Sequence, residues 1–433
     1  MFFGDIMQYV IKTLWFLATL LILVSSIYFT VKLKGIQFHL KKMIKSLSSD
    51  KTEKGFSNFQ TLMLTLSGRI GVGSIAGVSL AIYTGGIGTI FWLIITVFLC
   101  LTSTFCETVL GGIYKEQDVG YQYKGGPSYY IKKGLNKPKL GAVYAILIIV
   151  GYVGFFCSIQ SNTITKSLSQ TGVSQYVIAI ILSILTFIII YGGLKKITEF
   201  STVIVPVMTI IYILFAMFVF ISNIKLMPNI IVKIISDAFN FKSFFNGFIS
   251  GFLIGLQRGV FSNESGIGTG SIVSSTSSST NLIRQGYVQM LGIYITTFLI
   301  CFSTAIIVLT SDYQALNYVD MNGIEMTQQA FIYHFGNFGN IILVIFIFLF
   351  SFSTIITAYY YGESCLKYFG HISKIKIIIL KFLTTLIVFM GCIVSSNFLW
   401  SFVDIIVALL IIINIYAIIS LRKEILVYVN KND

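Results

Sequence analysis

Two hydrophobic segments of this chain are each interrupted in the middle by polar and glycine-rich residues. The first interruption reads Ser-Gly-Arg-Ile-Gly-Val-Gly-Ser-Ile-Ala-Gly over residues 67–77, and the second reads Gln-Arg-Gly-Val-Phe-Ser-Asn-Glu-Ser-Gly-Ile-Gly over residues 257–268. Lipid offers no hydrogen bonds to backbone, so unwound backbone at membrane depth is stable only inside packed protein or around a cavity. Two such interruptions in two halves of a chain predict a secondary transporter with its site at the bilayer midplane.

After Arg69, the first interruption contains three glycines, at positions 71, 73 and 77. Glycine lets a ligand or another backbone approach closely. The N–H groups of Gly73, Ser74 and Ile75 would begin a half-helix, whose positive end suits a carboxylate. Carbonyl groups freed before that half-helix suit an ammonium group or Na⁺. The alternative is that the small residues only allow tight helix packing.

Ionisable residues mark both interruptions. Arg69 lies in the first, and Arg258 and Glu264 lie in the second. Charged groups inside a membrane are costly and usually functional. We expect Arg69 to pair with Glu264 between the two broken segments, as a gate latch. The alternative is a static ion pair that holds the bundle together.

Neutral polar side chains interrupt two further apolar runs. Gln160 and Thr163 share one face of a helix and could meet an ammonium or carbonyl group. Ser353, Thr354 and Thr357 place hydroxyls on one face, where they could complete an oxygen cage for Na⁺ with carbonyls of the first interruption. The alternatives are hydrogen bonds between helices and hydrogen bonds to the residues' own helix.

The composition indicates a membrane protein. Of the 433 residues, 56% are hydrophobic and 11% charged, whereas soluble domains carry about 25% charged residues. The net charge of +14 comes from lysines in short loops, so it indicates topology and not nucleic-acid binding. Runs long enough to cross a bilayer predict eleven spans. The spans lie near residues 8–31, 57–82, 87–112, 141–170, 174–194, 197–222, 245–271, 285–310, 339–365, 374–395 and 397–421.

Most of the 30 Lys and Arg residues fall in alternate loops. The positive-inside rule then places the N-terminus outside and the C-terminus in the cytoplasm of a plasma membrane. The Lys- and Ile-rich composition favours a bacterial source. Residues 36–56 read equally well as a basic amphipathic helix on the inner surface or as a charged linker.

The order of the spans suggests an internal repeat. Without the first span ten remain, and the interruptions fall in the first and sixth of these. Two halves of five spans that start on opposite sides must be inverted repeats, which predicts an all-α, LeuT-like five-plus-five fold with one extra N-terminal helix. The expected divisions are residues 1–56 (first helix and basic linker), 57–222 and 223–421 (the two repeats) and 422–433 (cytoplasmic tail).

Several motifs resemble the alanine or glycine:cation symporter family over roughly residues 59–421. They are Gly-Val-Gly-Ser-Ile-Ala-Gly-Val at 71–78, Gly-Gly-Pro-Ser-Tyr-Tyr-Ile at 125–131, Gln-Ser-Asn at 160–162, Arg-Gly-Val-Phe-Ser-Asn-Glu-Ser-Gly-Ile-Gly at 258–268, Tyr-Tyr-Gly-Glu at 360–363 and the spacing Asp404, Ala408, Asn414. The block at 258–268 is highly specific.

The resemblance implies uptake of small neutral amino acids such as alanine or glycine, driven by Na⁺ or H⁺, with no organic cofactor. It implies a carboxylate site at Gly73 and Ser74 and an amino-group site at Gln160 and Thr354. The remaining pocket lining would be Phe261, Ser262, Asn263 and Ala358. The cation, expected to be Na⁺, would lie between the first and eighth core spans, with Gly71, Ser74, Ser353, Thr354 and Thr357 as its ligands.

Two positions depart from the family pattern. Ser74 stands where the family usually has Asn, and Ala358 stands where it usually has a bulky Trp. Loss of an indole would enlarge the pocket, so a bulkier amino acid is an alternative substrate, and H⁺ through Glu264 is an alternative coupling ion. A membrane enzyme or sensor is a remote alternative, because no His or Cys lies near either interruption to form a catalytic constellation. Sequence does not determine the oligomeric state.

Overall fold

Helices make up nearly all regular structure in the computed structural model. The structure describes residues 2–48, 55–118, 123–169, 172–240, 250–311, 323–370, 373–394 and 396–432. The first half contains α1 (Phe2–Lys32), η1 (Ile36–Phe38), α2 (Leu40–Lys45), α3 (Asn58–Arg69), α4 (Val72–Gly85), α5 (Thr89–Ile113), β1 (Glu116–Gln117), β2 (Tyr123–Lys124), α6 (Pro127–Lys133), α7 (Pro138–Ile148), η3 (Ile149–Phe156), α8 (Cys157–Ser169), α9 (Gln175–Tyr191) and α10 (Gly193–Ser222).

The second half is also helical. It contains η4 (Ile224–Leu226), α11 (Met227–Ala238), α12 (Ser250–Asn263), α13 (Thr269–Ser274), α14 (Leu282–Tyr294), η7 (Ile295–Cys301), α15 (Phe302–Leu309), α16 (Gly323–Leu366), η8 (Lys367–Phe369), α17 (Lys374–Gly391), α18 (Ser396–Ser420) and α19 (Arg422–Asn432).

Local sequence explains several helix boundaries. Ser57 and Gln60 form a reciprocal capping box at the start of α3, which satisfies backbone N–H groups that have no partner inside the helix. Asn281 caps α14 by accepting the N–H of Arg284 at 3.0 Å. Gly336, with φ 62° and ψ −151°, kinks α16, since only glycine adopts that conformation without strain.

Two short segments have the wider π-helical turn. η3 connects α7 to α8, and η7 connects α14 to α15. π-Helical turns are rare and often occur at functional sites. Side chains from both segments reach the interrupted helices, as described below.

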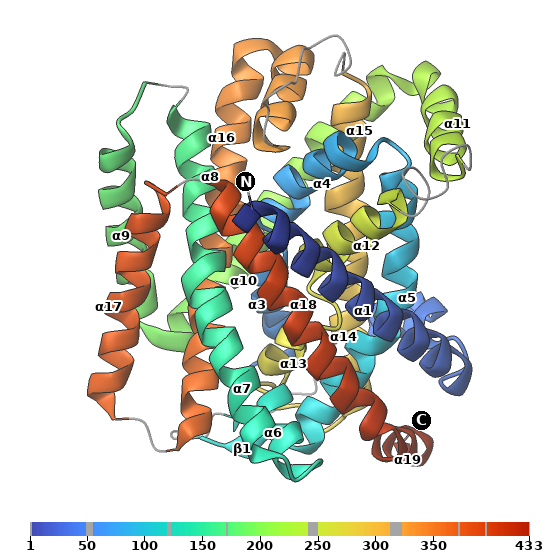
Figure 1. Cartoon of the computed structure of the whole chain (residues 1–433), viewed down its shortest axis with the longest axis vertical. Helices are drawn as coiled ribbons and strands as arrows, with labels where there is room; N and C mark the ends of the chain where they lie inside the picture. Colours follow the sequence, from blue (N-terminus) through green and yellow to red (C-terminus); the bar gives the residue numbers. More distant parts are fainter. Residues whose placement is uncertain are drawn as a thin grey trace.

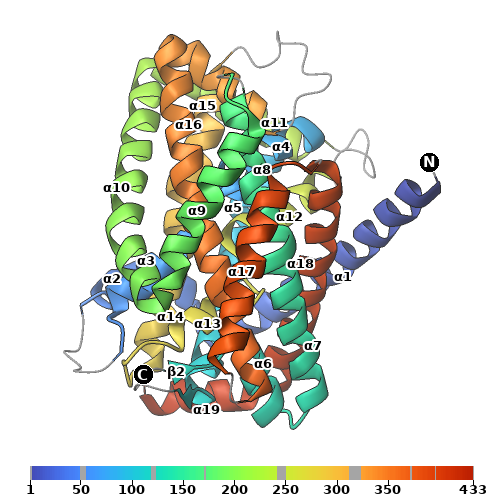
Figure 2. The ribbon, with the colours of Figure 1, turned by 90° about the vertical axis from the view of Figure 1, so that its left-hand side faces the viewer.

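The helices form a bundle whose two ends differ (Figure 1). α6, α19 and the β-hairpin lie at one end, and α11 lies at the other, which Figure 2 also shows. α1 crosses the outside of the bundle and packs against α18 and α5. Inside the bundle, α16 packs against α3, α4 and α8, while α12 packs against α4 and α5. The two interrupted segments therefore lie side by side at the centre of the protein.

The described residues contain seven helices long and apolar enough to cross a membrane, and the bent pair α3–α4 makes an eighth span. Each of the eleven predicted spans overlaps a helix, but three of these helices are too short or too charged to count as long, apolar membrane-crossing helices. α9 has only 17 residues and α12 only 14, while α17 carries Lys374, Lys376 and Lys381. The protein is thus a multi-pass membrane protein, and the count of eleven stays a prediction.

Within predicted segment 36–56, the structure has a regular α-helix only over α2, and residues 49–54 lie outside the described part. Residues 170, 245–249 and 395 of three predicted spans also lie outside it, as does residue 433 of the tail.

Candidate functional site

The first interruption is a break in a helix, as predicted. α3 ends at Arg69 and α4 begins at Val72, with a bend of 42° between them. Ile70 and Gly71 have non-helical dihedral angles, and Ser74 donates its N–H to the Gly71 carbonyl at 3.1 Å. The break frees carbonyl groups at the end of α3 and N–H groups at the start of α4 in the centre of the bundle.

Hydroxyl groups of α16 lie against the freed carbonyls. Thr354 Oγ1 is 3.0 Å from the carbonyl oxygen of Ser67 and 3.4 Å from that of Ile70. Ser353 donates to Ser67 O at 3.3 Å, and Thr357 donates to Ser67 Oγ at 2.9 Å. All these side chains are buried. Ser353 and Thr354 therefore meet carbonyls of the first break, and Thr357 joins this oxygen-rich group through the hydroxyl of Ser67.

Gln160 on α8 reaches the same break. Its Oε1 accepts the N–H of Val72 at 3.1 Å, while its Nε2 is buried without a partner among the described residues. A side chain on Gly71 would lie 2.5 Å from Thr354 Oγ1 and 3.0 Å from Gln160 Oε1. Glycine at 71 is therefore what lets α8 and α16 both contact the break.

The second interruption is a break between α12 and α13. Glu264, Gly266 and Gly268 have φ of 53°, 74° and 108°. Asn263 stabilises this turn, because its Oδ1 accepts the N–H of Ser265 at 2.9 Å. Its Nδ2 is buried and has no partner in the described part of the chain. This prediction from sequence is also confirmed.

Ser74 lies apart from the hydroxyls of α16. Its Oγ is 2.8 Å from Ser262 Oγ on α12, which is in turn 3.0 Å from Cys301 Sγ at the end of η7. Ser74 Oγ also donates to the carbonyl of Arg69 at 3.4 Å. The structure thus joins Ser74 to Ser262, as expected for a shared lining, but does not bring its hydroxyl to Ser353 or Thr357. α4 turns this side chain towards α12.

An aromatic group covers the start of α4. Phe261 on α12 is 2% exposed, and a side chain on Gly73 would lie 2.9 Å from its ring. The ring centroid of Phe261 is 5.2 Å from that of Phe156 and 5.1 Å from that of Trp400. Ala358 on α16 is also buried. Gly73 and Phe261 are therefore neighbours, as the resemblance implied.

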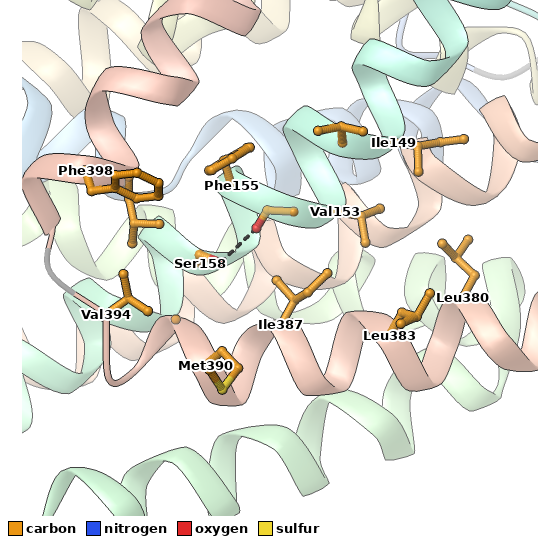
Figure 3. Close-up of a pocket in the computed structure, with 14 residues that line it drawn as sticks. Ile149, Val153, Phe155, Ser158, Leu380, Leu383, Ile387, Met390, Val394 and Phe398 are labelled. Atoms are coloured by element: carbon orange, nitrogen blue, oxygen red, sulfur yellow. Dashed lines mark hydrogen bonds between the residues drawn. The ribbon is translucent and has the colours of Figure 1, made fainter. Parts of the chain in front are cut away.

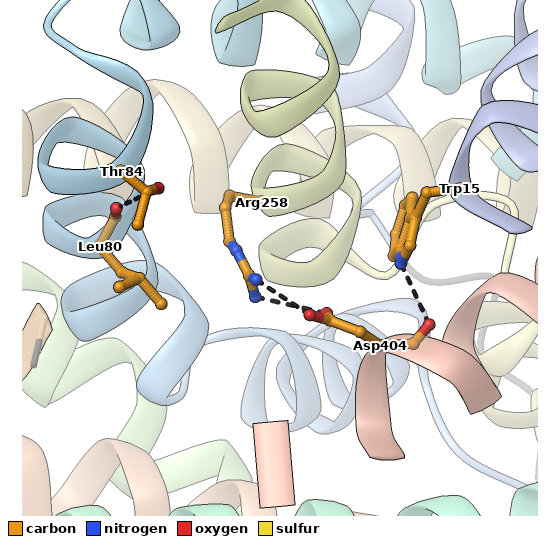
Figure 4. A network of polar contacts seen from close by, with 5 residues as sticks. All are labelled: Trp15, Leu80, Thr84, Arg258 and Asp404. Carbon is orange, nitrogen blue, oxygen red and sulfur yellow. Dashed lines mark hydrogen bonds and ion pairs between the residues drawn. The ribbon is translucent and has the colours of Figure 1, made fainter. Parts of the chain in front are cut away.

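Arg258 pairs with Asp404 of α18, not with Glu264 (Figure 4). Its Nη2 lies 3.0 Å from Asp404 Oδ2 and its Nη1 lies 3.4 Å from Oδ1. Trp15 of α1 donates its indole N–H to the carbonyl of Asp404 at 3.1 Å. The guanidinium also lies over the ring of Trp400, 5.1 Å from its centroid. This network fastens α12, α18 and α1 together next to Phe261.

The expected ion pair of Arg69 with Glu264 is not formed among the described residues. Arg69 Nη1 donates to the carbonyl of Gln289 on α14 at 3.0 Å. Glu264 Oε2 accepts instead from Thr269 at 2.8 Å and from Tyr361 at 3.2 Å. The positive φ at Glu264 starts the turn into α13, which directs the carboxylate towards these hydroxyls.

An apolar cleft of about 430 Å³ lies between η3, α8 and α17 (Figure 3), and its lining includes no residue of either break. Its lining includes Val153, Phe155, Leu383, Ile387 and Met390. The hydroxyl there, on Ser158, donates to the carbonyl of Gly154 within its own helix at 2.8 Å. The lining offers an amino acid little to bind its charged groups, so the candidate site is the region between the breaks.

Sequence reasoning missed several partners of the site. Asp404 is a carboxylate inside an apolar span. Because such a charge needs a partner, its pairing with Arg258 could have been predicted. Trp15, Phe156, Cys301 and Trp400 carry no such signal, because aromatic and Cys residues are common throughout apolar helices.

Comparison with known proteins shows the family of this chain. The family model of the sodium:alanine symporter family matches residues 2–432. The amino-acid carrier protein AlsT of Bacillus subtilis is 36% identical over 98% of this chain and 90% of its own length. The sodium/alanine symporter AgcS of Methanococcus maripaludis is 31% identical, over 89% and 87%.

Among solved structures, a mutant manganese transporter of Eremococcus coleocola aligns with a TM-score of 0.54. The identity is 14%, and the alignment covers 82% of this chain and 74% of that one. This likeness concerns the fold alone. The family and its named members are transporters and not enzymes. The chain belongs to the sodium:alanine symporter family.

Proposed function

We propose that this protein is a secondary active symporter that couples the uptake of a small neutral amino acid to Na⁺. One observation carries the proposal. Hydroxyls of α16 meet freed carbonyls at the end of α3, directly beside the N-terminus of α4. An oxygen-rich group suits an alkali cation, and a helix N-terminus suits a carboxylate, so both ligands of a symporter have a place at one break.

The amino acid would bind at the start of α4. Its carboxylate would bind at Gly73 and Ser74, at the positive end of the half-helix, where the N–H of Gly73 would donate to it. Its ammonium group would face Gln160 Oε1 and Thr354 Oγ1, both of which lie next to Gly71. Ser262 and Asn263 would complete the lining. The amide Nδ2 of Asn263, which has no partner among the described residues, would be available to the substrate.

Na⁺ would bind among the carbonyls of Ser67 and Ile70 and the hydroxyls of Ser353, Thr354 and Thr357. These are neutral oxygens, which hard cations accept as ligands. Gly71 is a less favourable ligand than the sequence suggested, because its carbonyl accepts from Ser74 N at 3.1 Å. Ser74, which bonds to Ser262, is assigned to the substrate.

Transport would follow alternating access in a LeuT-like five-plus-five repeat with eleven spans and an external N-terminus. The breaks support this assignment, since they fall in the first and sixth of the ten predicted spans that follow α1. α19, in the tail predicted to be cytoplasmic, lies with the lysine-bearing α6 at one end of the bundle, opposite α11 (Figure 2).

In this orientation, Arg258 and Asp404 lie on the outer side of the substrate site and would close it. Asp404→Asn should weaken the pair and speed release of bound amino acid to the outside on the order of tenfold, since breaking a partly buried charge pair leaves an unpaired Arg. The side chains of the pair are 12% and 7% exposed. The release rate of labelled amino acid from protein in Na⁺ measures this.

The control is Glu116→Gln, which breaks the more exposed pair with Lys133 at the periphery. Equal release rates in wild type and Asp404→Asn would rule out a gate at this pair.

Substrate identity would depend on the space near Ala358. We expect purified protein to bind alanine and some larger neutral amino acids in Na⁺ but not in choline. Ala358→Trp should add an indole to the buried wall and shift preference at least about tenfold towards glycine and alanine, because overpacking excludes larger side chains. Competition by a panel of amino acids against labelled alanine, in both proteins, measures the shift.

Unchanged selectivity in Ala358→Trp would exclude this wall as the determinant of substrate size. Binding that is independent of Na⁺ would contradict the proposed coupling.

A further inference from the structure

A second polar group lies buried beside the breaks and takes no part in the site proposed above. It consists of Arg69 on α3, Glu107 on α5, Glu264 between α12 and α13, Gln289 on α14 and Asn414 on α18. We name these five residues the Arg69 cluster. Their exposed fractions are between 0% and 2%. Five parts of the bundle therefore direct charged or amide groups to one region away from solvent.

Only part of the hydrogen-bonding capacity of the cluster is used. Arg69 Nη1 donates to the carbonyl of Gln289, and Glu107 Oε2 accepts from Asn414 Nδ2 at 2.9 Å. Thr269 and Tyr361 donate to Glu264 Oε2. Within the described part of the chain, the atoms left without a partner are Nε and Nη2 of Arg69, Oε1 of Glu107, Oε1 of Glu264, and both amide atoms of Gln289.

Several of these atoms converge on Gly270. A side chain at position 270 would lie 2.8 Å from Arg69 Nη2, 3.3 Å from Gln289 Oε1 and 3.4 Å from Glu107 Oε1. Glycine thus leaves room where a donor and two acceptors face each other. Buried polar atoms without partners are rare in native proteins, so such a group points to an occupant that they bind.

The charges identify that occupant. One guanidinium and two carboxylates give a net negative charge in a region without solvent, which is costly unless a cation compensates it. A metal cation at Gly270 would lie next to Arg69 Nη2, which repels it. A proton on a carboxylate has no such conflict, and it supplies a donor for the unpartnered oxygen of Gln289.

Among the described residues, Arg69 is the one positively charged group that interacts with the carboxyls of Glu107 and Glu264. The titratable groups that interact with them are phenols and thiols, which are neutral near pH 7 at their usual pKa values. They are Cys100 and Cys106 of α5, Tyr130 of α6, Tyr144 of α7, Tyr152 of η3 and Tyr361 of α16.

We propose that the Arg69 cluster is a proton-binding site in which Glu107 and Glu264 share one proton. A hydronium ion from the solvent supplies the proton: one of its O–H bonds breaks, leaving water, and the proton adds to a carboxylate oxygen to give a carboxylic acid. The remaining carboxylate balances Arg69. The site is separate from the oxygen-rich group of α16 and does not depend on which amino acid is transported.

Infrared titration of the purified full-length protein tests the proposal. Wild type at neutral pH should show the C=O stretching band of a protonated carboxylic acid, which disappears at alkaline pH. Glu107→Gln and Glu264→Gln should each abolish this band, because the one remaining carboxylate is then balanced by Arg69. Arg69→Gln should instead increase the band about twofold, since neither carboxylate keeps a counter-charge.

The matched control is Glu363→Gln, which removes a buried carboxylate outside the cluster that already pairs with Lys367 at 3.2 Å. It should leave the band unchanged. Monodisperse elution and thermal unfolding show which variants are folded. If only one of Glu107→Gln and Glu264→Gln folds, that variant alone tests the shared proton. A band that is absent in wild type, or that survives in a folded Glu107→Gln or Glu264→Gln protein, would overturn the shared proton. A band that appears only when Na⁺ is removed would assign the site to a metal cation instead.

Discussion

Replacing Gly71 by alanine is expected to lower the rate of Na⁺-driven amino acid uptake by about 100-fold or more. The added Cβ would lie 2.5 Å from Thr354 Oγ1, closer than atoms can pack, and 3.0 Å from Gln160 Oε1, which is a tight contact. Both neighbours belong to the proposed site, so either one must move or the break must open. A displacement of about 1 Å at a positioned site can cost about 100-fold in rate. Initial uptake rates in liposomes, normalised to the amount of inserted protein, measure the effect.

Gly77→Ala is the matched control, because Gly77 is on the same half-helix. The nearest atom to a side chain there is the carbonyl oxygen of Val72 at 3.8 Å, which is ordinary contact. We expect its uptake rate to stay within about twofold of wild type, since alanine there makes no clash and favours the helix. Equal rates for the two variants would show that close approach at Gly71 is not required.

Thr354→Val is expected to raise the Na⁺ concentration for half-maximal uptake by roughly 10- to 100-fold. Valine keeps the shape of threonine but removes the hydroxyl that lies next to the carbonyls of Ser67 and Ile70. Loss of one polar partner of a charged group costs about 1.5–3 kcal/mol, which corresponds to that range. The measurement is uptake against Na⁺ concentration at constant ionic strength and a fixed, saturating amino acid concentration.

Thr384→Val on α17 is the control for this substitution. Thr384 is also fully buried, and its hydroxyl donates to the carbonyl of Leu380 in its own helix. It should leave the Na⁺ requirement unchanged. If both variants shift the requirement equally, the hydroxyl of Thr354 is not a ligand and the cation site must lie elsewhere.

Sequence alone predicted the two breaks, because glycine and charge inside an apolar segment are costly in a membrane unless the helix is interrupted around a packed or polar site. It also predicted that hydroxyls of residues 353–357 would meet carbonyls of the first break, since their spacing places them on one helical face. The structure confirms both breaks, and it places the hydroxyls of Ser353 and Thr354 against a freed carbonyl, whereas that of Thr357 bonds to the Ser67 hydroxyl.

The direction of individual side chains could not be predicted in the same way. Ser74 was expected beside the hydroxyls of α16, but the rotation of α4 directs it to Ser262. Arg69 was expected to pair with Glu264, yet the turn after α12 leaves both in a wider cluster with Glu107. Helix rotation and turn geometry depend on packing between distant segments, and spacing along one helix carries no information about them.

Long-range partners were the least predictable part of the site. Trp15 bonds to Asp404 across 389 residues of sequence, and the π-helical turn of η7 ends at Cys301 beside Ser262. α1 lies outside the repeat that sequence suggested, so nothing in its apolar pattern indicated a contact with the candidate gate. Such contacts follow from the three-dimensional arrangement of the bundle.

The most direct test of coupled transport is uptake of labelled alanine by the purified protein in liposomes, under an inward Na⁺ gradient and, separately, an inward proton gradient of equal size. We expect accumulation above equilibrium with the Na⁺ gradient and none with the proton gradient alone. The oxygen-rich group at the first break would then be the coupling site. Accumulation with the proton gradient alone, or with neither gradient, would contradict Na⁺-coupled amino acid symport by this protein.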